Sequence, residues 1–176
     1  MIKRPDGGRL SFNNLIEIHV LRSLRVAHEI RLDRVREALE IAQKEFGVDR
    51  LLINEQLRMS AGQLFLDRYG MIADLSRSQQ LAMRALFKGS LKRIEYTQNG
   101  LPRDFFPMQR IGNTGQKLIL VSPVIAFGRA VIERLAVSTH IIADRLNAGE
   151  GEESVMNDYG LERGELEEAA AYEAAA

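Results

Sequence analysis

The most regular hydrophobic pattern in the chain predicts a helix from Leu32 to Phe46. Its apolar residues recur at spacings of three and four, which places them on one helical face: Leu32, Val35, Leu39, Ala42 and Phe46. Gly47 follows at the position where helices commonly end in a left-handed residue. A second apolar face predicts an earlier helix, capped by Ser11 and running to about Arg25. The chain is therefore expected to begin with two amphipathic helices.

The pattern changes in the next segment, where short apolar runs replace the helical period. We expect two strands, residues 63–69 and 70–75, which turn at Gly70. Ser76 and Gln79 then have the spacing of a capping box, and the apolar residues after them predict that a helix follows.

A β-hairpin is predicted after that helix. Residues 93–97 form the first strand, Asn99-Gly100 is a type I′ turn signal, and residues 101–106 return. Because proline cannot donate a ladder hydrogen bond, Pro102 is expected to place the return strand at an edge or to end it early.

A polar, glycine-containing stretch at residues 111–117 is the predicted linker. Strands at 118–121 and near 127–132 follow it. The sequence thus divides into an N-terminal domain, residues 1–110, and a C-terminal domain, residues 118–176.

The C-terminal domain is expected to end in three short helices. Ser138 or Thr139 caps the first and Gly149 stops it, Gly160 ends the second, and Glu162 starts the third. A short helix, a glycine-containing turn and a second short helix have the outline of a helix-turn-helix. We therefore predict an α+β protein: a mostly helical N-terminal region with small β-hairpins, and a compact C-terminal domain of two strands and a helix-turn-helix-like three-helix unit.

Length and composition narrow the class of protein. The 176 residues include no cysteine, which excludes a disulfide framework and thiolate catalysis. No apolar run approaches the roughly 18 residues needed to cross a bilayer, and the N-terminus lacks the apolar stretch of a secretion signal. We expect a cytoplasmic protein without membrane contact.

The net charge of zero hides a marked asymmetry. After residue 149 there are 9 acidic residues and 1 basic residue, a balance of −8, so the preceding chain carries +8. The third predicted helix, which starts at Glu162, lies within this acidic stretch. DNA phosphates would repel it, and we expect it to bind a protein instead. The candidate partner-binding residues are Tyr159, Glu165, Glu168 and Tyr172.

Basic side chains cluster where the first helix ends and the second begins. These candidate DNA-binding residues, which could straddle a phosphate backbone, are Arg22, Arg25, Arg31, Arg34 and Arg36. The alternative is an ordinary solvated surface, since acidic residues interleave with them: Glu29, Asp33, Glu37 and Glu40.

No pattern of residues points to catalysis. The histidines His19, His28 and His140 lie far apart in sequence, and there is no nucleophile elbow and no glycine-rich phosphate loop. His140 and Asp144 have the spacing of metal ligands on a helix, but a helix-surface contact explains one such pair better. We expect no enzyme activity, no cofactor and no metal.

Several segments resemble VapB-type antitoxin-like proteins, in which a MerR-like helix-turn-helix region precedes a small C-terminal domain of unknown function. In the N-terminal half these are residues 10–25, 35–39, 73–83 and 91–94. In the C-terminal half, where the likeness is more specific, they are residues 124–132, 139–150 and 158–161.

The resemblance implies a type II toxin–antitoxin module, in which the protein binds a toxin, often a PIN-type ribonuclease, and represses its own operon. It also implies a homodimer, because such regulators bind two half-sites. Only ten residues precede Ser11, so the first helix-turn-helix of the family is expected to be lacking. The alternative function is a protein-interaction module with no DNA-binding role.

Overall fold

The structure, a computed structural model, describes residues 10–27, 32–47, 50–58, 60–72, 75–107 and 115–175. Over these residues the protein is α+β, with seven α-helices and a four-stranded antiparallel sheet. None of the described helices is both long and apolar enough to cross a membrane. The chain divides into two compact units, which we call the N-terminal unit (1–103) and the C-terminal unit (104–176).

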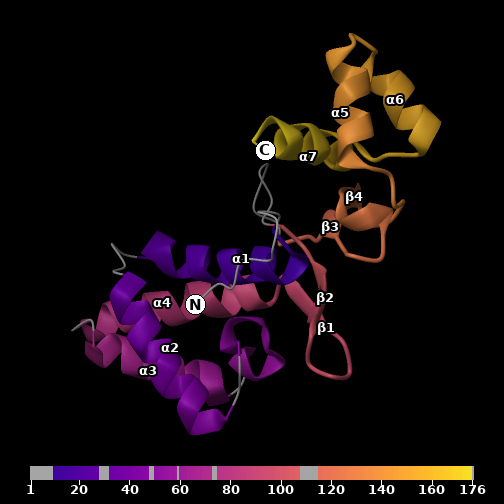
Figure 1. Ribbon diagram of the computed structural model, residues 1–176. Coiled ribbons are helices and arrows are strands. Elements are labelled where there is room, and N and C mark those ends of the chain that lie inside the picture. Colours follow the sequence, from indigo (N-terminus) through magenta and orange to yellow (C-terminus); the bar gives the residue numbers. More distant parts are fainter. Residues whose placement is uncertain are drawn as a thin grey trace. The chain divides into compact units, whose positions relative to one another are not determined.

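Four helices make up most of the N-terminal unit. Helix α1 packs against α4, and α2 packs against α3 (Figure 1). Two short 3-10 helices lie between α2 and α3. The bounds are α1 Phe12–Ala27, α2 Leu32–Phe46, η1 Leu51–Ile53, η2 Glu55–Arg58, α3 Ser60–Ile72 and α4 Arg77–Leu91.

The first two helices confirm the sequence prediction because their ends are fixed locally. Ser11 caps α1: its Oγ accepts a hydrogen bond from the Asn14 N–H (3.2 Å), and Asn14 Oδ1 accepts one from the Ser11 N–H (3.1 Å). Helix α2 has the predicted bounds, and Gly47 after it has a φ of +63°. The apolar face of α2 is buried at Val35, Ala38, Leu39 and Ala42.

The two strands predicted for residues 63–75 are wrong, because residues 60–72 form helix α3. The apolar side chains of this segment gather on one helical face, and the buried ones are Phe65, Leu66 and Tyr69. Gly70 is not a turn. A Cβ there would lie 2.9 Å from Cδ of Gln80 in α4, so glycine leaves room for the Gln80 side chain.

Helix α4 begins at the predicted capping box. The Ser76 N–H donates to Gln79 Oε1 (2.9 Å), and the Gln79 N–H donates to Ser76 Oγ (3.4 Å). Its buried Phe87 packs against Phe65 of α3, with ring centroids 5.9 Å apart. This contact joins the two helix pairs of the core.

The hairpin is present, with strands β1 (Ile94–Tyr96) and β2 (Pro102–Phe105), but its turn is not type I′. The Gly100 N–H donates to the Thr97 carbonyl (2.9 Å), and the Thr97 N–H donates to the Leu101 carbonyl (2.8 Å). Gly100 has a φ of +72°, whereas Asn99 is not at positive φ, as a type I′ turn would require. The loop therefore has three residues and ends in a left-handed glycine.

Strand β2 is internal, which corrects the expectation for Pro102. The sheet order is β1-β2-β3-β4, with β3 at Ile119–Val121 and β4 at Ala130–Ile132, and Phe105 pairs with Val121. Pro102 is buried as the first residue of its strand, a position where a missing N–H is tolerated. The boundary between the two units along the chain falls within this strand, ahead of the predicted linker, of which only residues 115–117 are described.

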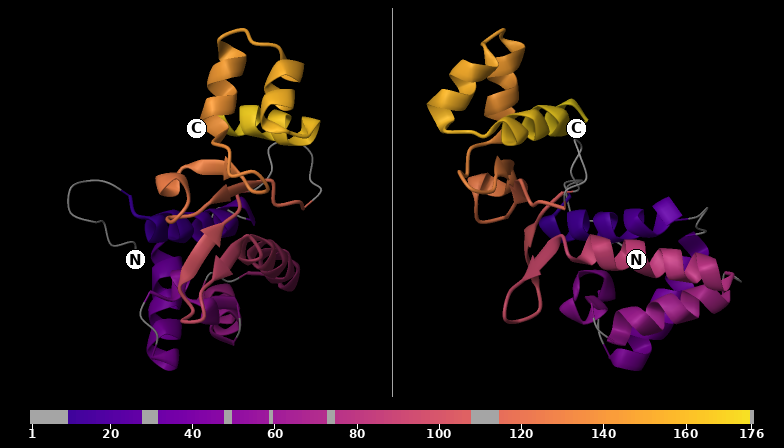
Figure 2. Two further views of the ribbon diagram at one scale, coloured as in Figure 1. Left: turned by 90° about the vertical axis from the view of Figure 1, so that its right-hand side faces the viewer. Right: turned by 180° about the vertical axis from the view of Figure 1, so that it is seen from behind.

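The C-terminal unit ends in the three predicted helices: α5 Thr139–Asn147, α6 Glu152–Tyr159 and α7 Arg163–Ala174. Gly160 ends α6 in a left-handed conformation with φ +67°. Helices α5 and α6 run side by side and α7 lies across them (Figure 2). Their shared core consists of Ile132, Ile142, Val155, Leu161, Leu166 and Ala169.

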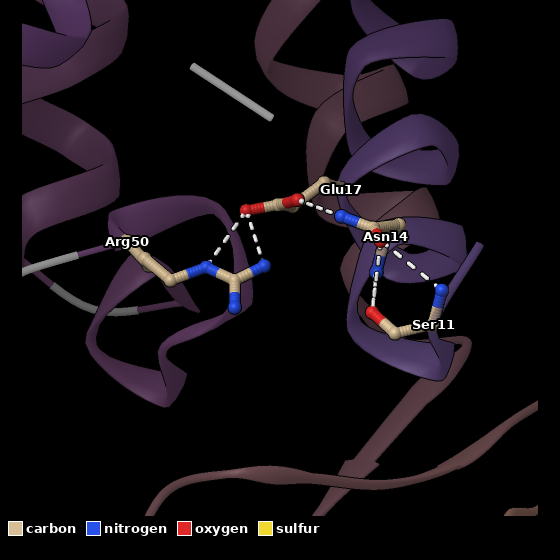
Figure 3. A network of polar contacts seen from close by, with 4 residues as sticks. All are labelled: Ser11, Asn14, Glu17 and Arg50. Atoms are coloured by element: carbon tan, nitrogen blue, oxygen red, sulfur yellow. Dashed lines mark hydrogen bonds and ion pairs between the residues drawn. The ribbon is translucent and has the colours of Figure 1, made fainter. Parts of the chain in front are cut away.

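A buried carboxylate joins α1 to the turn before η1 (Figure 3). Glu17 is 3 % exposed, and one of its oxygens lies 3.1 Å from Nε and 2.9 Å from Nη2 of Arg50. Its other oxygen accepts a hydrogen bond from Asn14 Nδ2 (3.2 Å). Arg50 has a left-handed φ of +53°, a conformation that costs energy for any residue other than glycine. The ion pair holds the turn in this conformation.

We predict that Arg50→Ala lowers the free energy of unfolding by about 2 to 3 kcal/mol, because it leaves the buried Glu17 carboxylate without its cation. Alanine keeps the strain at positive φ, so the loss reports the ion pair. Urea denaturation followed by circular dichroism measures it. Arg103→Ala is the control, since it breaks an exposed pair with Glu95 and should cost under about 1 kcal/mol. Equal losses in both variants would contradict the prediction.

Candidate functional site

The candidate DNA-binding arginines do not share one environment. Arg22 on α1 and Arg36 on α2 are exposed. Arg25 also belongs to α1, and Arg31 lies outside the described residues. Of the arginines whose side chains the structure describes, Arg22 and Arg36 are therefore exposed without an ion pair to a described residue.

Arg34 is engaged with its own helix. Its Nη1 lies 3.4 Å from a carboxylate oxygen of Glu37, and its Nε lies 4.0 Å from Asp33. All three side chains are well exposed, so this contact is a weak surface ion pair. At this residue the interleaved acids compete with phosphate for the guanidinium.

The two units carry opposite net charges. The N-terminal unit has 18 Lys and Arg against 12 Asp and Glu, a balance of +6. The C-terminal unit has 6 Lys and Arg against 12 Asp and Glu, a balance of −6. Net charge of this size directs which charged molecules approach each unit.

Glu165, a candidate partner-binding residue, is buried in an intramolecular ion pair. It is 4 % exposed, and its two oxygens lie 2.8 Å from Nη2 and 3.1 Å from Nε of Arg134. The Glu162 N–H also donates to it (2.8 Å), and Arg134 donates to the Gly160 carbonyl (2.9 Å). These bonds fasten the turn after β4 to the start of α7.

The other three candidate partner-binding residues are also buried or half-buried in the unit. Glu168 is 2 % exposed. Tyr159 is half-buried against the core, with the Arg145 guanidinium 5.1 Å from its ring centroid, and Tyr172 is half-buried. Their role in partner binding stays a prediction, but burial leaves Glu165 and Glu168 little surface for contact.

Arg145 holds α5 to the start and end of α6. Its Nε donates to Glu150 Oε2 (2.6 Å), and its Nη2 donates to Asp158 Oδ2 (2.6 Å). The hydrogen bonds from Arg145 hold the pKa of Glu150 below its ordinary value. Glu150 and Asp158, two of the nine acidic residues after residue 149, therefore form ion pairs within the unit.

Three of the exposed acids of this unit lie at helix starts, whereas Glu133, Asp144 and Asp158 do not. Glu152 and Glu153 occupy the first turn of α6, and Glu162 is the N-cap of α7. Anions are favoured at these positions by the helix dipole. Glu152 pairs with Arg163 (3.1 Å), whereas Glu153 and Glu162 have no ion pair with any described residue.

The three histidines are not brought together. His28 lies outside the described residues, and His140 is exposed on α5, 3.3 Å from Asp144 and 3.8 Å from Glu173. Within the described ranges no group of three His, Cys, Asp or Glu could hold a metal ion. His140 with Asp144 is thus the helix-surface contact that the spacing suggested.

His19 is half-buried on α1, with Nε2 3.1 Å from the Ser90 carbonyl of α4. Loss of solvation by burial lowers its pKa. The hydrogen bond to Ser90 acts against that decrease, and the charges of Arg93 and Arg22 add to it. The net effect is a pKa below the ordinary 6.5.

One exposed residue carried no sequence signal. Phe127, in the short 3-10 helix η3 (Ala126–Gly128) between β3 and β4, is fully exposed. In the sequence it lies in an apolar run that resembles a turn into a strand, so nothing marked it as different from a core residue.

Comparisons with known proteins support the fold more than a function. Residues 119–172 match the model of a family described as a protein of unknown function (DUF433). The crystal structure of Rv2018 from Mycobacterium tuberculosis is similar, with a TM-score of 0.73 and 21 % identity. The likeness covers 96 % of this chain and 82 % of that one. None of the curated proteins matches the chain.

The family match begins at β3 and ends within α7, so it lies inside the C-terminal unit. It agrees with the resemblance of that part to a domain of unknown function. It does not reach the N-terminal unit, where the MerR-like likeness stays a prediction. The likeness to Rv2018, at 21 % identity, shows a shared fold alone.

We predict that stability decreases as the pH falls below about 6.5. There the unfolded chain binds a proton at His19 that the folded chain takes up less readily, because the folded pKa is lowered. His19→Gln, which can still donate to Ser90, should flatten this part of the stability profile. Thermal unfolding between pH 8 and pH 5 (a range of about 3 units) measures it. An unchanged profile in the variant would refute the assignment.

Proposed function

We propose that this protein is an antitoxin-like regulator of a type II toxin–antitoxin module. In this proposal the C-terminal unit binds a toxin protein, a PIN-type ribonuclease, and the N-terminal unit contacts operator DNA as a homodimer. The observation that carries the proposal is the opposite charge of the two units, +6 and −6. It supports two different partners, one anionic and one cationic.

The acidic unit suits a nuclease partner for an electrostatic reason. A ribonuclease binds polyanionic substrate and therefore carries a basic cleft, which an acidic surface attracts and can cover. The exposed acids that are not engaged in an ion pair with a described residue include Glu133, Glu153 and Glu162, whereas Glu165 and Glu168 are buried. The likeness to antitoxin-like proteins noted in the sequence adds the class of partner.

The basic unit suits DNA only where arginines are free to reach phosphates. Arg22 and Arg36 are exposed and have no ion pair with any residue in the described ranges. Contacts of this kind give affinity without base specificity.

A protein-interaction module without a DNA role is the second candidate. Arg34 favours it, because this arginine is occupied by Glu37 and Asp33. Helix α2 also exposes Glu40 and Lys44, so its surface is one of mixed charge. The two candidates share the C-terminal partner and differ only in DNA binding.

The first prediction from this proposal concerns the protein partner. We expect a small ribonuclease to co-purify with the tagged full chain from its native cells at moderate salt. Glu153→Gln combined with Glu162→Gln should then raise its Kd about ten-fold, mainly through slower association, because both charges are exposed. Surface plasmon resonance with purified proteins measures this.

The matched control is Glu40→Gln with Glu55→Gln, which removes two charges from the N-terminal unit and should leave the Kd unchanged. If the control weakened binding as much as the test variant did, the C-terminal unit would not be the binding unit. Co-purification of no protein would refute the toxin-binding role.

The second prediction concerns DNA. Arg22→Ala with Arg36→Ala should weaken binding to the duplex upstream of the protein's own gene. If each arginine contacts one phosphate, the slope of log K against log salt should fall by about 2. Fluorescence anisotropy titrations at several salt concentrations measure it. Arg77→Ala, an exposed arginine on α4, is the control. Salt-independent or absent DNA binding would leave the interaction module as the function.

A further inference from the structure

The turn between β3 and β4 exposes two large apolar side chains. Phe127 is 102 % exposed, more than any other large hydrophobic residue among those described, and Val124 in the same turn is 83 % exposed. Residue Arg129, which follows directly, is exposed as well. Aromatic and arginine side chains are enriched where protein interfaces gain most of their energy.

The backbone beneath Phe127 is held in an unfavourable conformation. Three successive residues are left-handed, with φ +47° at Ala126, +55° at Phe127 and +80° at Gly128. Only the last is glycine, so the other two residues carry a steric cost. The Gly128 N–H donates to the Ile125 carbonyl (2.9 Å), and the Arg129 N–H donates to the Ala126 carbonyl (3.1 Å).

The base of the turn is packed although its tip is not. Ile125 and Ala126 lie against a buried cluster formed by Phe106, Leu120 and Val131. Ile125 and the left-handed residues after it thus form a fixed platform. The platform directs the Phe127 ring away from the core, and the ring contributes nothing to the stability of the fold that would offset the strain.

We propose that Phe127 is the anchor by which the C-terminal unit binds its protein partner, inserting into an apolar pocket on a basic surface. The inference rests on the proposed toxin-binding function and names the contact that would carry it. A preorganised aromatic loses little conformational entropy when it enters a pocket.

Charge decides what kind of molecule the pocket belongs to. Arg129 beside Phe127 is basic, but the unit as a whole has a net charge of −6, which repels nucleic acid and an anionic lipid surface at long range. A second copy of the whole chain has zero net charge, and only its N-terminal unit, at +6, would be attracted. A basic protein is attracted, and a nuclease has a basic surface of this kind.

The first test measures the Kd of the co-purified partner for full-length variants. Phe127→Gly removes the ring and relieves the strain at positive φ, so it should raise the Kd by about ten-fold or more while Tm stays the same or increases. Ile141→Ala is the control, because Ile141 is an exposed apolar residue on α5 of the same unit, 48 % exposed. It should leave the Kd unchanged.

The second test identifies what touches the ring. A benzophenone amino acid is placed at position 127 of the full chain and, as the comparison, at position 141, and the cells are irradiated. The inference predicts a cross-link to the co-purified basic protein from 127 and not from 141. Cross-links to lipid, nucleic acid or a second copy of the chain would overturn it.

The outcomes separate this inference from the function on which it rests. A partner that binds Phe127→Gly as tightly as the wild type overturns the anchor and leaves the proposed function intact. Failure of the wild-type chain to bind any protein overturns both.

Discussion

A buried glutamate paired with an arginine from a distant turn is the interaction on which both units depend. Glu17 pairs with Arg50 in the N-terminal unit, and Glu165 pairs with Arg134 in the C-terminal unit. Each carboxylate lies on a helix and is almost fully buried, whereas each arginine stays about one third to one half exposed. A guanidinium suits this position because its donors can reach a buried carboxylate while the rest remains hydrated.

The same pairing changes what the acidic C-terminus can do. Its sequence suggested a continuous acidic surface, but Arg134 and Arg145 engage three of its carboxylates within the unit. The helix starts hold others in favourable dipole positions. The acidic unit therefore attracts a partner through its net charge rather than through a dense cluster of exposed acids. Such long-range attraction speeds association but provides few direct contacts in the complex. Close contact must then come from other residues.

The turn at Phe127 supplies what the acidic surface lacks. Elsewhere in the C-terminal unit most large apolar side chains pack into the core formed by β4 and the three helices, Ile141 being an exposed exception. Outside the turn the positive φ values fall on glycines and on Ala136. At this turn Ala126 and Phe127 both have positive φ although neither is glycine, and the Phe127 ring is fully exposed. Local rules that fail together, without a compensating contact in the fold, are expected at sites shaped by binding.

Features that depend on neighbours in sequence were determined by the sequence alone. The capping box at Ser76, the left-handed Gly47 and the three short C-terminal helices need only local hydrogen bonds and backbone preferences. Tertiary structure decided the rest. Residues 60–72 form a helix because their apolar face meets two other helices, and Glu165 is buried because Arg134, 31 residues away, reaches it. Phe127 is exposed because no described element of its own unit covers it, and a sequence pattern does not record which residues pack against a side chain.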